Sequence, residues 1–424
     1  TSGGDIADFI VRPLHEARQD EREETLFTRA ERGLVWCASM KEASSTDEAA
    51  ELLVNGFCVI LFPKTGKALA CEVKTGEKRS PSAPEAENTV KGAKDAFTET
   101  LRTNTSLIRR HLRTPELRLE ESVVGRRSLT KVTVCWVEGL TDPELPARMK
   151  KRLGEIDIDG LLSPAAVEEY VTGARKTAFP LLEFTERTDH FCQGLLDGQV
   201  GLLVDGLPIG YLAPVSFGRL MRSPEDRATD YLSASMLRIL RYLALGVSLL
   251  LPGIYAAMAM FHQQMLPTKL LLSIVESKQD VPFSTLFEVV GLLCAFELLQ
   301  QAGLHLPQAI GTAVSIIGGL VVGTAAVDAK LVSPAALIVT ASSGICGFTL
   351  PNRELSDALR LWRLGLTVLG GVFGLFGVTA GVLLLLVMLA GLESLGRSYL
   401  APFGEAEVKG ALVRERLAEQ KWRD

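Results

Sequence analysis

Two long apolar runs follow one another in the second half of the chain and constrain the fold more than any other stretch. They cover residues 309–327 and 331–352, contain no charged residue, and are separated only by Asp328, Ala329 and Lys330. A helix of roughly 20 residues crosses the hydrocarbon core of a bilayer, so each run is about long enough to span it. A soluble protein can bury one such helix, but two in tandem beside further apolar runs predict a membrane domain.

We expect an all-α transmembrane domain over residues 236–400. It contains five apolar segments, near 242–261, 281–303, 309–327, 331–352 and 364–392. The last segment would form a helix about 43 Å long, which exceeds a hydrocarbon core of roughly 30 Å. We therefore expect this helix to be tilted, kinked or extended beyond the bilayer, with Gly370-Gly371 as a natural break point.

The distribution of positive charge leaves the topology of these segments open. If residues 281–303 cross fully, Arg353, Arg360 and Arg363 lie inside, as the positive-inside rule prefers, but the basic C-terminal tail lies outside. If residues 281–303 are re-entrant, the tail lies inside and the three arginines lie outside. One element is therefore expected to be a half-span or a broken helix.

The residues before the membrane domain are charged and mixed in composition, and they predict a soluble α+β region of two subdomains. The first covers residues 1–88 and ends in a Ser/Pro/Glu-rich linker, and the second covers residues 89–235. A charged tail, residues 401–424, follows the membrane domain. Residue 1 is Thr, so we expect the natural start to be missing. Because no cleavable signal peptide precedes the soluble part, we expect it to stay in the cytoplasm.

Hairpins and one amphipathic helix characterise the soluble region. A helix over Lys94–Arg113 would place four apolar side chains on one face, those of Phe97, Leu101, Ile108 and Leu112. A hairpin is expected over residues 195–215, turning at Asp205-Gly206. Its glycines and the following Arg-Ser-Pro resemble an earlier hairpin around residues 55–81, and this internal repeat predicts that the two subdomains are related.

Composition and failed motifs argue against several function classes. The net charge of -5 leaves no basic excess to neutralise phosphates, so we expect no nucleic-acid partner. The seven cysteines are scattered and lack C-x-x-C spacing, so we expect reduced thiols. The P-loop-like segment 62–68 lacks its leading glycine, and the calcium-loop-like segment 157–160 has its glycine too early. We therefore expect no enzyme, no cofactor and no metal site.

A small set of residues in the membrane domain carries the functional hypotheses. Ionisable groups at membrane depth are costly and usually line water or pair with one another. A cation pathway or gate and a helix in the interface with solvated carboxylates stay equally open for the acids of 281–303. The candidates for a pore or gate are Glu288, Glu297, Ser342, Ser343 and Asn352. Glycines at four-residue spacing allow close helix packing, and the candidates for that role are Gly319, Gly323, Gly370 and Gly374.

From residue 90 to residue 403 the chain also resembles a known family. The stretches that carry the resemblance include VKGAKDAFTETLRTNTSLIRRHLRTPEL (90–117), EIDIDGLL (155–162), LPTKLLLSIVESKQDVPF (266–283), LPQAIGTAVSIIGGLVVG (306–323) and FTLPN (348–352). They are similar to the A subunits of the GerA family of bacterial spore germinant receptors. The related stage V sporulation homologue is the alternative, because it shares the architecture.

The resemblance implies a multi-pass protein of the spore inner membrane with its N-terminal domain in the cytoplasm. It implies a homo-oligomer in contact with membrane lipid, which acts with a transporter-like B subunit and a lipoprotein C subunit. The implied function is a nutrient-gated cation channel that triggers germination. Two rival hypotheses stay open: a secondary transporter of a small solute, and a non-conducting membrane scaffold that docks receptor partners. A transporter should show two matching sets of broken membrane helices.

Overall fold

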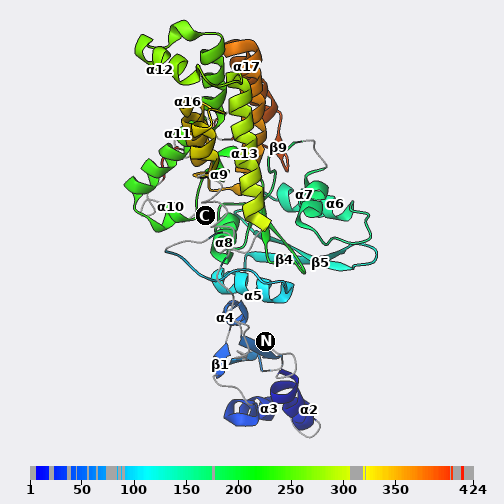
Figure 1. Cartoon of the computed structure of the whole chain (residues 1–424). Helices are drawn as coiled ribbons and strands as arrows, with labels where there is room; N and C mark the ends of the chain where they lie inside the picture. Colours follow the sequence, from blue (N-terminus) through cyan, green and yellow to red (C-terminus); the bar gives the residue numbers. More distant parts are fainter. Residues whose placement is uncertain are drawn as a thin grey trace. The chain divides into compact units, whose positions relative to one another are not determined.

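The chain forms two compact units in the computed structural model. One unit takes in residues 1–174, 184–213 and 423–424, and the other takes in 175–183 and 214–422 (Figure 1). The structure describes residues 6–18, 23–35, 40–43, 45–54, 57–63, 65–72, 84, 87, 91–173, 177–305, 319, 321–401, 403 and 412–414. Most of the expected linker, the first half of the apolar run 309–327 and most of the tail 401–424 lie outside the described residues.

The first unit begins with a small α/β part that has its own core. Its elements are η1 (Ala7–Val11), α2 (Arg12–Arg18), α3 (Glu23–Arg29), η2 (Ala30–Leu34), β1 (Met40–Ala43), α4 (Thr46–Val54), β2 (Phe57–Phe62) and β3 (Lys67–Glu72). The strands form an antiparallel sheet in the order β1-β3-β2. Phe62 and Leu69 on this sheet pack against Leu26 and Phe27 of α3, so the helices cover its apolar face.

The larger part of the first unit is built on a five-stranded sheet in the order β4-β5-β7-β8-β6. Its elements are α5 (Leu101–His111), β4 (Leu117–Val124), β5 (Thr130–Val137), α6 (Glu144–Gly154), α7 (Pro164–Thr172), β6 (Glu183–Thr185), α8 (Thr188–Leu196), β7 (Val200–Val204) and β8 (Gly210–Ala213). Strands β5, β7 and β8 are rich in β-branched and aliphatic residues, which suit a central position in a sheet. The expected α+β region is therefore present.

The expected amphipathic helix forms, but it begins later than its sequence pattern indicates. All four predicted core positions are buried, in one cluster with Phe191 of α8 and Leu203 of β7. The helix begins only at Leu101, because the buried side chain of Asn104 holds the backbone of Thr98 in a loop. Asn104 Oδ1 accepts from Thr98 N at 2.8 Å and its Nδ2 donates to Thr98 O at 2.6 Å.

The expected hairpin at Asp205-Gly206 is confirmed as the β7–β8 pair. Gly206 has a φ of +87°, a conformation that favours glycine, and its N donates to Glu99 O at 2.8 Å. In a second hairpin, β2–β3, Thr65 N and Gly66 N donate to Phe62 O at the end of β2. Both hairpins follow a helix, α4 in one case and α8 in the other. A relationship between the two subdomains stays a prediction, and Asn55-Gly56 of the repeat lies outside the described residues.

The second unit consists of apolar helices. Its elements are α9 (Phe217–Leu220), α10 (Glu225–Ala228), α11 (Tyr231–Met260), η3 (Gln263–Met265), α12 (Thr268–Lys278), α13 (Thr285–His305), η4 (Val321–Ala325), α15 (Ala326–Asp328), α16 (Pro334–Gly347), α17 (Arg353–Ala390), β9 (Glu393–Ser394) and β10 (Arg397–Ser398). Among the described residues, three helices are long and apolar enough to cross a bilayer, α11, α13 and α17.

Helix α17 folds back on itself at Gly374, which has φ +65° and ψ −152°. Along a straight helix Leu366 and Gly381 would be about 22 Å apart, at 1.5 Å per residue. A methyl group placed at Gly381 would instead lie 2.5 Å from Leu366 Cδ2. A methyl group at Gly370 would lie 2.9 Å from Val378 Cγ2, which again requires contact between the two halves. The 38-residue helix is therefore a hairpin of two antiparallel helices, and its break lies at Gly374 rather than at Gly370-Gly371.

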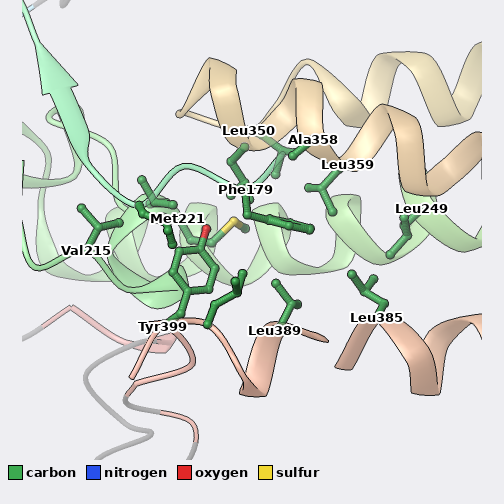
Figure 2. Packing of buried hydrophobic residues seen from close by; sticks show 14 of the residues in the cluster. Phe179, Val215, Met221, Leu249, Leu350, Ala358, Leu359, Leu385, Leu389 and Tyr399 are labelled. Carbon is green, nitrogen blue, oxygen red and sulfur yellow. The ribbon is translucent and has the colours of Figure 1, made fainter. Parts of the chain in front are cut away.

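Both ends of this hairpin lie where α11 begins, which we call the near end of the second unit. Leu355 of the first half and Leu389 of the second half share one core with Val215 and Met221. Figure 2 shows Leu249 of α11 between Leu359 of the first half and Leu385 of the second. The Gly374 turn lies at the far end, where a methyl group on Gly374 would approach His262 Cε1 to 2.7 Å.

The chain after the hairpin returns to the same core. Phe217 N donates to Tyr399 O at 2.7 Å, and Ser394 Oγ accepts from Val215 N at 2.9 Å. Ser394 Oγ also donates to Leu181 O at 2.6 Å. Residues 175–183 and 214–235 therefore belong to the helical unit, so the boundary lies earlier than the expected residue 236.

Candidate functional site

Glu288 of α13 is buried and fully engaged at the far end of the helices. Its side chain has 0% exposure, and its Oε1 lies 3.0 Å from Lys278 Nζ, at the end of α12. Its Oε2 accepts from Ser333 N at 2.9 Å and from Ser333 Oγ at 2.7 Å. Because the carboxylate is paired and hydrogen-bonded, the cost of burying its charge is offset. Glu288 therefore connects α12, α13 and the start of α16.

Glu297, the second acid of α13, lies toward the other end of the same helix. Its Oε1 accepts from Arg360 Nη1 of α17 at 3.1 Å, and Arg360 also contacts Asp357 at 3.1 Å. Each acid of α13 is paired with a cation from another helix, Glu288 while fully buried and Glu297 while 37% exposed. The two acids lie about 13 Å apart along α13, at 1.5 Å per residue, and their pairs do not form a single site.

Ser343 satisfies a backbone carbonyl that a proline leaves free. Pro252 interrupts α11 and has no N–H, so the carbonyl of Ser248, four residues earlier, loses its helical partner. Ser343 Oγ of α16 donates to this Ser248 O at 2.7 Å. The same hydroxyl oxygen lies 3.5 Å from Nη1 of the buried Arg363. Ser343 thus binds α16 to α11 and lies beside an arginine in α17.

The other two polar candidates lie near this region. Ser342 is half-buried on α16, one residue before Ser343. Asn352 is the N-cap of α17, and its Oδ1 accepts from Leu355 N at 2.8 Å. This contact satisfies one of the free N–H groups at the start of the helix.

The four glycine candidates have different surroundings. A methyl group on Gly370 would lie 2.5 Å from Gly253 O of α11, so α17 and α11 are in backbone contact there. Gly374 forms the turn of the hairpin. Gly323 would make only an ordinary contact, 4.0 Å from Leu337, and Gly319 has nothing within 4 Å among the described residues.

A buried ionic cluster joins the near end of α11 to α10. Asp226 is 2% exposed and pairs with Arg241 at 2.8 Å and with Arg238 at 3.3 Å. A C-terminal residue joins the same region, since Arg414 N donates to Ser235 Oγ at 3.2 Å and Arg414 also contacts Thr229 O. The described part of the tail therefore packs at the near end.

Sequence reasoning missed the partners of these charges. Ser333 precedes Pro334 at the start of an apolar run, and a serine in that position signals a helix N-cap. Arg363 was expected in a loop with Arg353 and Arg360, but it lies inside α17 and is buried. Among the described residues, no three side chains are grouped as a metal site would require.

Comparison with known families agrees with the arrangement of a mixed N-terminal unit and apolar helices. The family described as Bacillus/Clostridium GerA spore germination protein matches residues 3–424. The chain is 35% identical over 415 residues to the uncharacterized membrane protein YfkQ of Bacillus subtilis strain 168, covering 96% of this chain and 80% of that protein. It is 36% identical over 378 residues to spore germination protein KA of the same organism, covering 88% of this chain and 70% of that protein.

A solved structure is also similar in part. The crystal structure of the N-terminal domain of the A subunit of a Bacillus megaterium spore germinant receptor has 28% identity and a TM-score of 0.35. The similarity covers 47% of this chain and 70% of that one. The family match over nearly the whole chain and the identities above 30% with relatives of which 70% or more is covered carry the assignment. The chain belongs to the GerA family of spore germination proteins.

Proposed function

We propose that this chain is the A subunit of a spore germinant receptor and forms a nutrient-gated cation channel as a homo-oligomer in the spore inner membrane. It acts with a transporter-like B subunit that binds the nutrient and with a lipoprotein C subunit. The proposal includes no enzymatic chemistry. Family membership supports the receptor role, and the channel role is our own extension of it.

The paired acids of α13 are the observation that carries the channel role. Ionisable groups in apolar membrane helices usually mark ion pathways. Glu288 and Glu297 are both neutralised by cations, at 3.0 Å and 3.1 Å, so the described state offers no free carboxylate to a passing cation on α13. Opening would release at least one of these pairs, and a partner that binds nutrient better in the open state would shift the population toward it.

The positions of the chain ends support the orientation that we propose. Helix α11 begins at the near end, and residues 393–401 return to that end, so in the proposed orientation the chain would cross the bilayer an even number of times. Many arginines of the second unit lie on the elements of this end, among them Arg238, Arg241, Arg353, Arg360, Arg363 and Arg397. The positive-inside rule therefore places the near end, and with it the N-terminal unit and the tail, in the cytoplasm. With the fold-back at Gly374, Arg353, Arg360 and Arg363 and the described residues of the tail would lie on the same, cytoplasmic side.

Exposed apolar residues on the first turns of α11 support the homo-oligomer. The 19 residues from Tyr242 to Met260 span about 28 Å and fill a hydrocarbon core of roughly 30 Å. The preceding turns then lie outside the core, yet Leu232, Met236 and Leu240 are 75%, 63% and 53% exposed. Contact with water would be unfavourable for this stripe, and a neighbouring copy would cover it.

Ion flux through reconstituted receptor tests the proposal. The A, B and C subunits are placed in liposomes loaded with a potassium- or sodium-sensitive dye, and nutrient is added. We expect cation efflux that depends on nutrient and on the A subunit. Efflux that requires B alone would favour a transporter. A complete complex that binds nutrient and never passes cations would identify the A subunit as a non-conducting scaffold.

A further inference from the structure

Arg363 is a buried cation that makes no direct ion pair among the described residues, although the charge of Glu297 acts on it from a greater distance. It lies in the first half of α17, is 7% exposed, and stays protonated at any physiological pH. Among the described residues, its side chain makes one hydrogen bond, the 3.5 Å contact from Nη1 to Ser343 Oγ. The acid of α13 toward this end, Glu297, is engaged by Arg360 at 3.1 Å. A charge buried inside apolar helices is costly unless a counter-charge accompanies it.

The guanidinium opens onto a small cavity that glycine creates. A methyl group placed on Gly347 would lie 3.1 Å from Ser248 Oγ and 3.9 Å from Arg363 Nη1, so both polar groups converge on the space beside this glycine. Gly347 is helical, and its hydrogen atom leaves that space open. Gln300, Ser356 and Arg360 also line the pocket.

The charge around this pocket is positive. Arg360 and Arg363 both line it, and Glu297, whose side chain is 37% exposed, pairs with Arg360. The second acid beside Arg360, Asp357, is 53% exposed and is therefore solvated. Ser248 Oγ supplies a hydroxyl donor, while the hydroxyl of Ser343 is already donated to Ser248 O. The pocket thus offers one unbalanced cation and one hydroxyl donor.

The pocket has space only for a small ligand. The free space in the pocket is small, on the scale of a few water molecules. We propose that the pocket formed by Arg363, Ser248 and Gly347 binds a halide-sized anion, chloride in the cell. The bound anion completes the charge balance among α11, α13, α16 and α17. This site does not depend on whether the protein conducts cations.

Anion-dependent stability of the full-length protein in detergent tests the site. Thermal unfolding is compared in sodium chloride, sodium bromide and sodium gluconate at equal ionic strength. A bound anion stabilises the folded state by mass action, so we expect Tm to be higher by about 3 °C in either halide at a concentration roughly ten times Kd. Line broadening of the chlorine NMR signal on addition of protein measures the same binding directly.

Three variants separate the site from general salt effects. Gly347→Ala fills the cavity while leaving Arg363 in place, and Arg363→Gln removes the charge. We expect both to lose the Tm difference between halide and gluconate and to lose the line broadening. Gly365→Ala is the control, because nothing lies within 4 Å of a methyl group there and the residue is on the same helix as Arg363. It should keep the full halide effect.

Clear results would overturn the site. If unmodified protein unfolds at the same Tm in halide and gluconate, water alone occupies the pocket and the proposal is wrong. If Gly347→Ala and Arg363→Gln keep the halide effect, the anion binds elsewhere. Should Arg363→Gln fail to fold, Ser248→Ala decides the question, since loss of one donor should weaken halide binding several-fold while the fold is kept.

Discussion

Glu288 Oε2 accepts two hydrogen bonds from Ser333, one from the backbone N at 2.9 Å and one from Oγ at 2.7 Å. Ser333 is the N-cap of α16, and its Oγ in turn accepts from Ala336 N at 3.3 Å. Lys278 of α12 supplies the positive charge at 3.0 Å. One buried carboxylate therefore holds α12, α13 and α16 together, and its removal should loosen the packing of all three helices.

We predict that Glu288→Gln destabilises the helical unit by roughly 3 kcal/mol, because Lys278 is left partly buried without its counter-charge. Thermal unfolding of the detergent-solubilised chain measures this loss. The double variant Glu288→Gln/Lys278→Met should recover much of the stability, since it removes both charges. Glu276→Gln on the exposed side of α12 is the control and should change little. A double variant no more stable than Glu288→Gln would show that the ion pair is not the cause.

The same variant tests the role of Glu288 in conduction. If the acid belongs to the pore or gate, Glu288→Gln should alter cation selectivity or the nutrient dependence of opening in liposomes. Unchanged selectivity and gating, in protein shown to be folded, would leave Glu288 with a structural role only. Glu297→Gln is examined in the same assay, because its partner Arg360 lies on a different helix from Lys278.

A second prediction concerns the hairpin in α17. Gly374 has φ +65° and ψ −152°, which only glycine adopts readily, and a methyl group would meet His262 Cε1 at 2.7 Å. We expect Gly374→Ala to cost about 3 kcal/mol from backbone strain and this contact. Gly365→Ala in the first half of the hairpin has open space and ordinary helical geometry, so it should be neutral or stabilising by up to about 1 kcal/mol.

Thermal unfolding of the two alanine variants, side by side, checks the hairpin. Equal stability of both would mean that Gly374 does not adopt the observed turn. A further comparison is Gly381→Leu, whose side chain would collide with Leu366 across the hairpin. A straight 38-residue helix would tolerate leucine at that position, whereas the hairpin would not.

Much of the local structure could be predicted from the sequence, because it depends on short-range patterns. The spacing of Phe97, Leu101, Ile108 and Leu112 identified a buried face, and the Asp205-Gly206 turn identified a hairpin. Asn104 shows the limit of this approach. Its hydrogen bonds to Thr98 shift the start of the helix, and the spacing of apolar residues gives no sign of these bonds.

The helical hairpin of α17 and the ionic contacts depend on tertiary structure, so they could not be predicted from the sequence. Gly374 lies in an apolar run with Gly370, Gly371, Gly377 and Gly381, and composition alone does not distinguish the one that turns. Ser333 is 45 residues from Glu288, and Arg360 is 63 residues from Glu297. Such pairings follow from how the helices pack. A sequence pattern can therefore identify the charged residues in apolar segments, but it cannot predict which residues they pair with.

The orientation of the ends gives a third prediction. Cysteine introduced at Arg397, after the hairpin, and at Arg102, in the soluble unit, should react with a membrane-impermeant maleimide from the same side of the membrane. Cysteine at Asp280, an exposed residue at the far end, should react only from the opposite side. Labelling of intact and inverted vesicles measures this, with the unmodified chain as the background for native thiols. Labelling of positions 102 and 397 from opposite sides would contradict an even number of crossings.

The last prediction concerns acid sensitivity of the soluble unit, which centres on Asp95. This side chain is 12% exposed, and its Oδ2 lies 2.8 Å from Arg110 Nη2 and 2.7 Å from His111 Nε2. Burial by itself would raise the pKa of Asp95, but the hydrogen bond and charge of His111 outweigh it and lower the pKa below its usual value. A carboxyl group with a lowered pKa stabilises the folded state above its unfolded pKa of about 3.9 and loses that contribution as pH falls further.

We therefore expect Asp95→Asn to destabilise the soluble unit by about 1 kcal/mol at neutral pH and to flatten its loss of stability below about pH 4. Amide hydrogen exchange of α5 in the full chain, followed across this pH range, reports the soluble unit separately from the membrane helices. Asp157→Asn is the matched control, because its carboxylate is 65% exposed and its pair with Arg126 should contribute no more than about 0.5 kcal/mol. If both variants behave alike, the acid sensitivity of α5 arises from carboxylates other than Asp95.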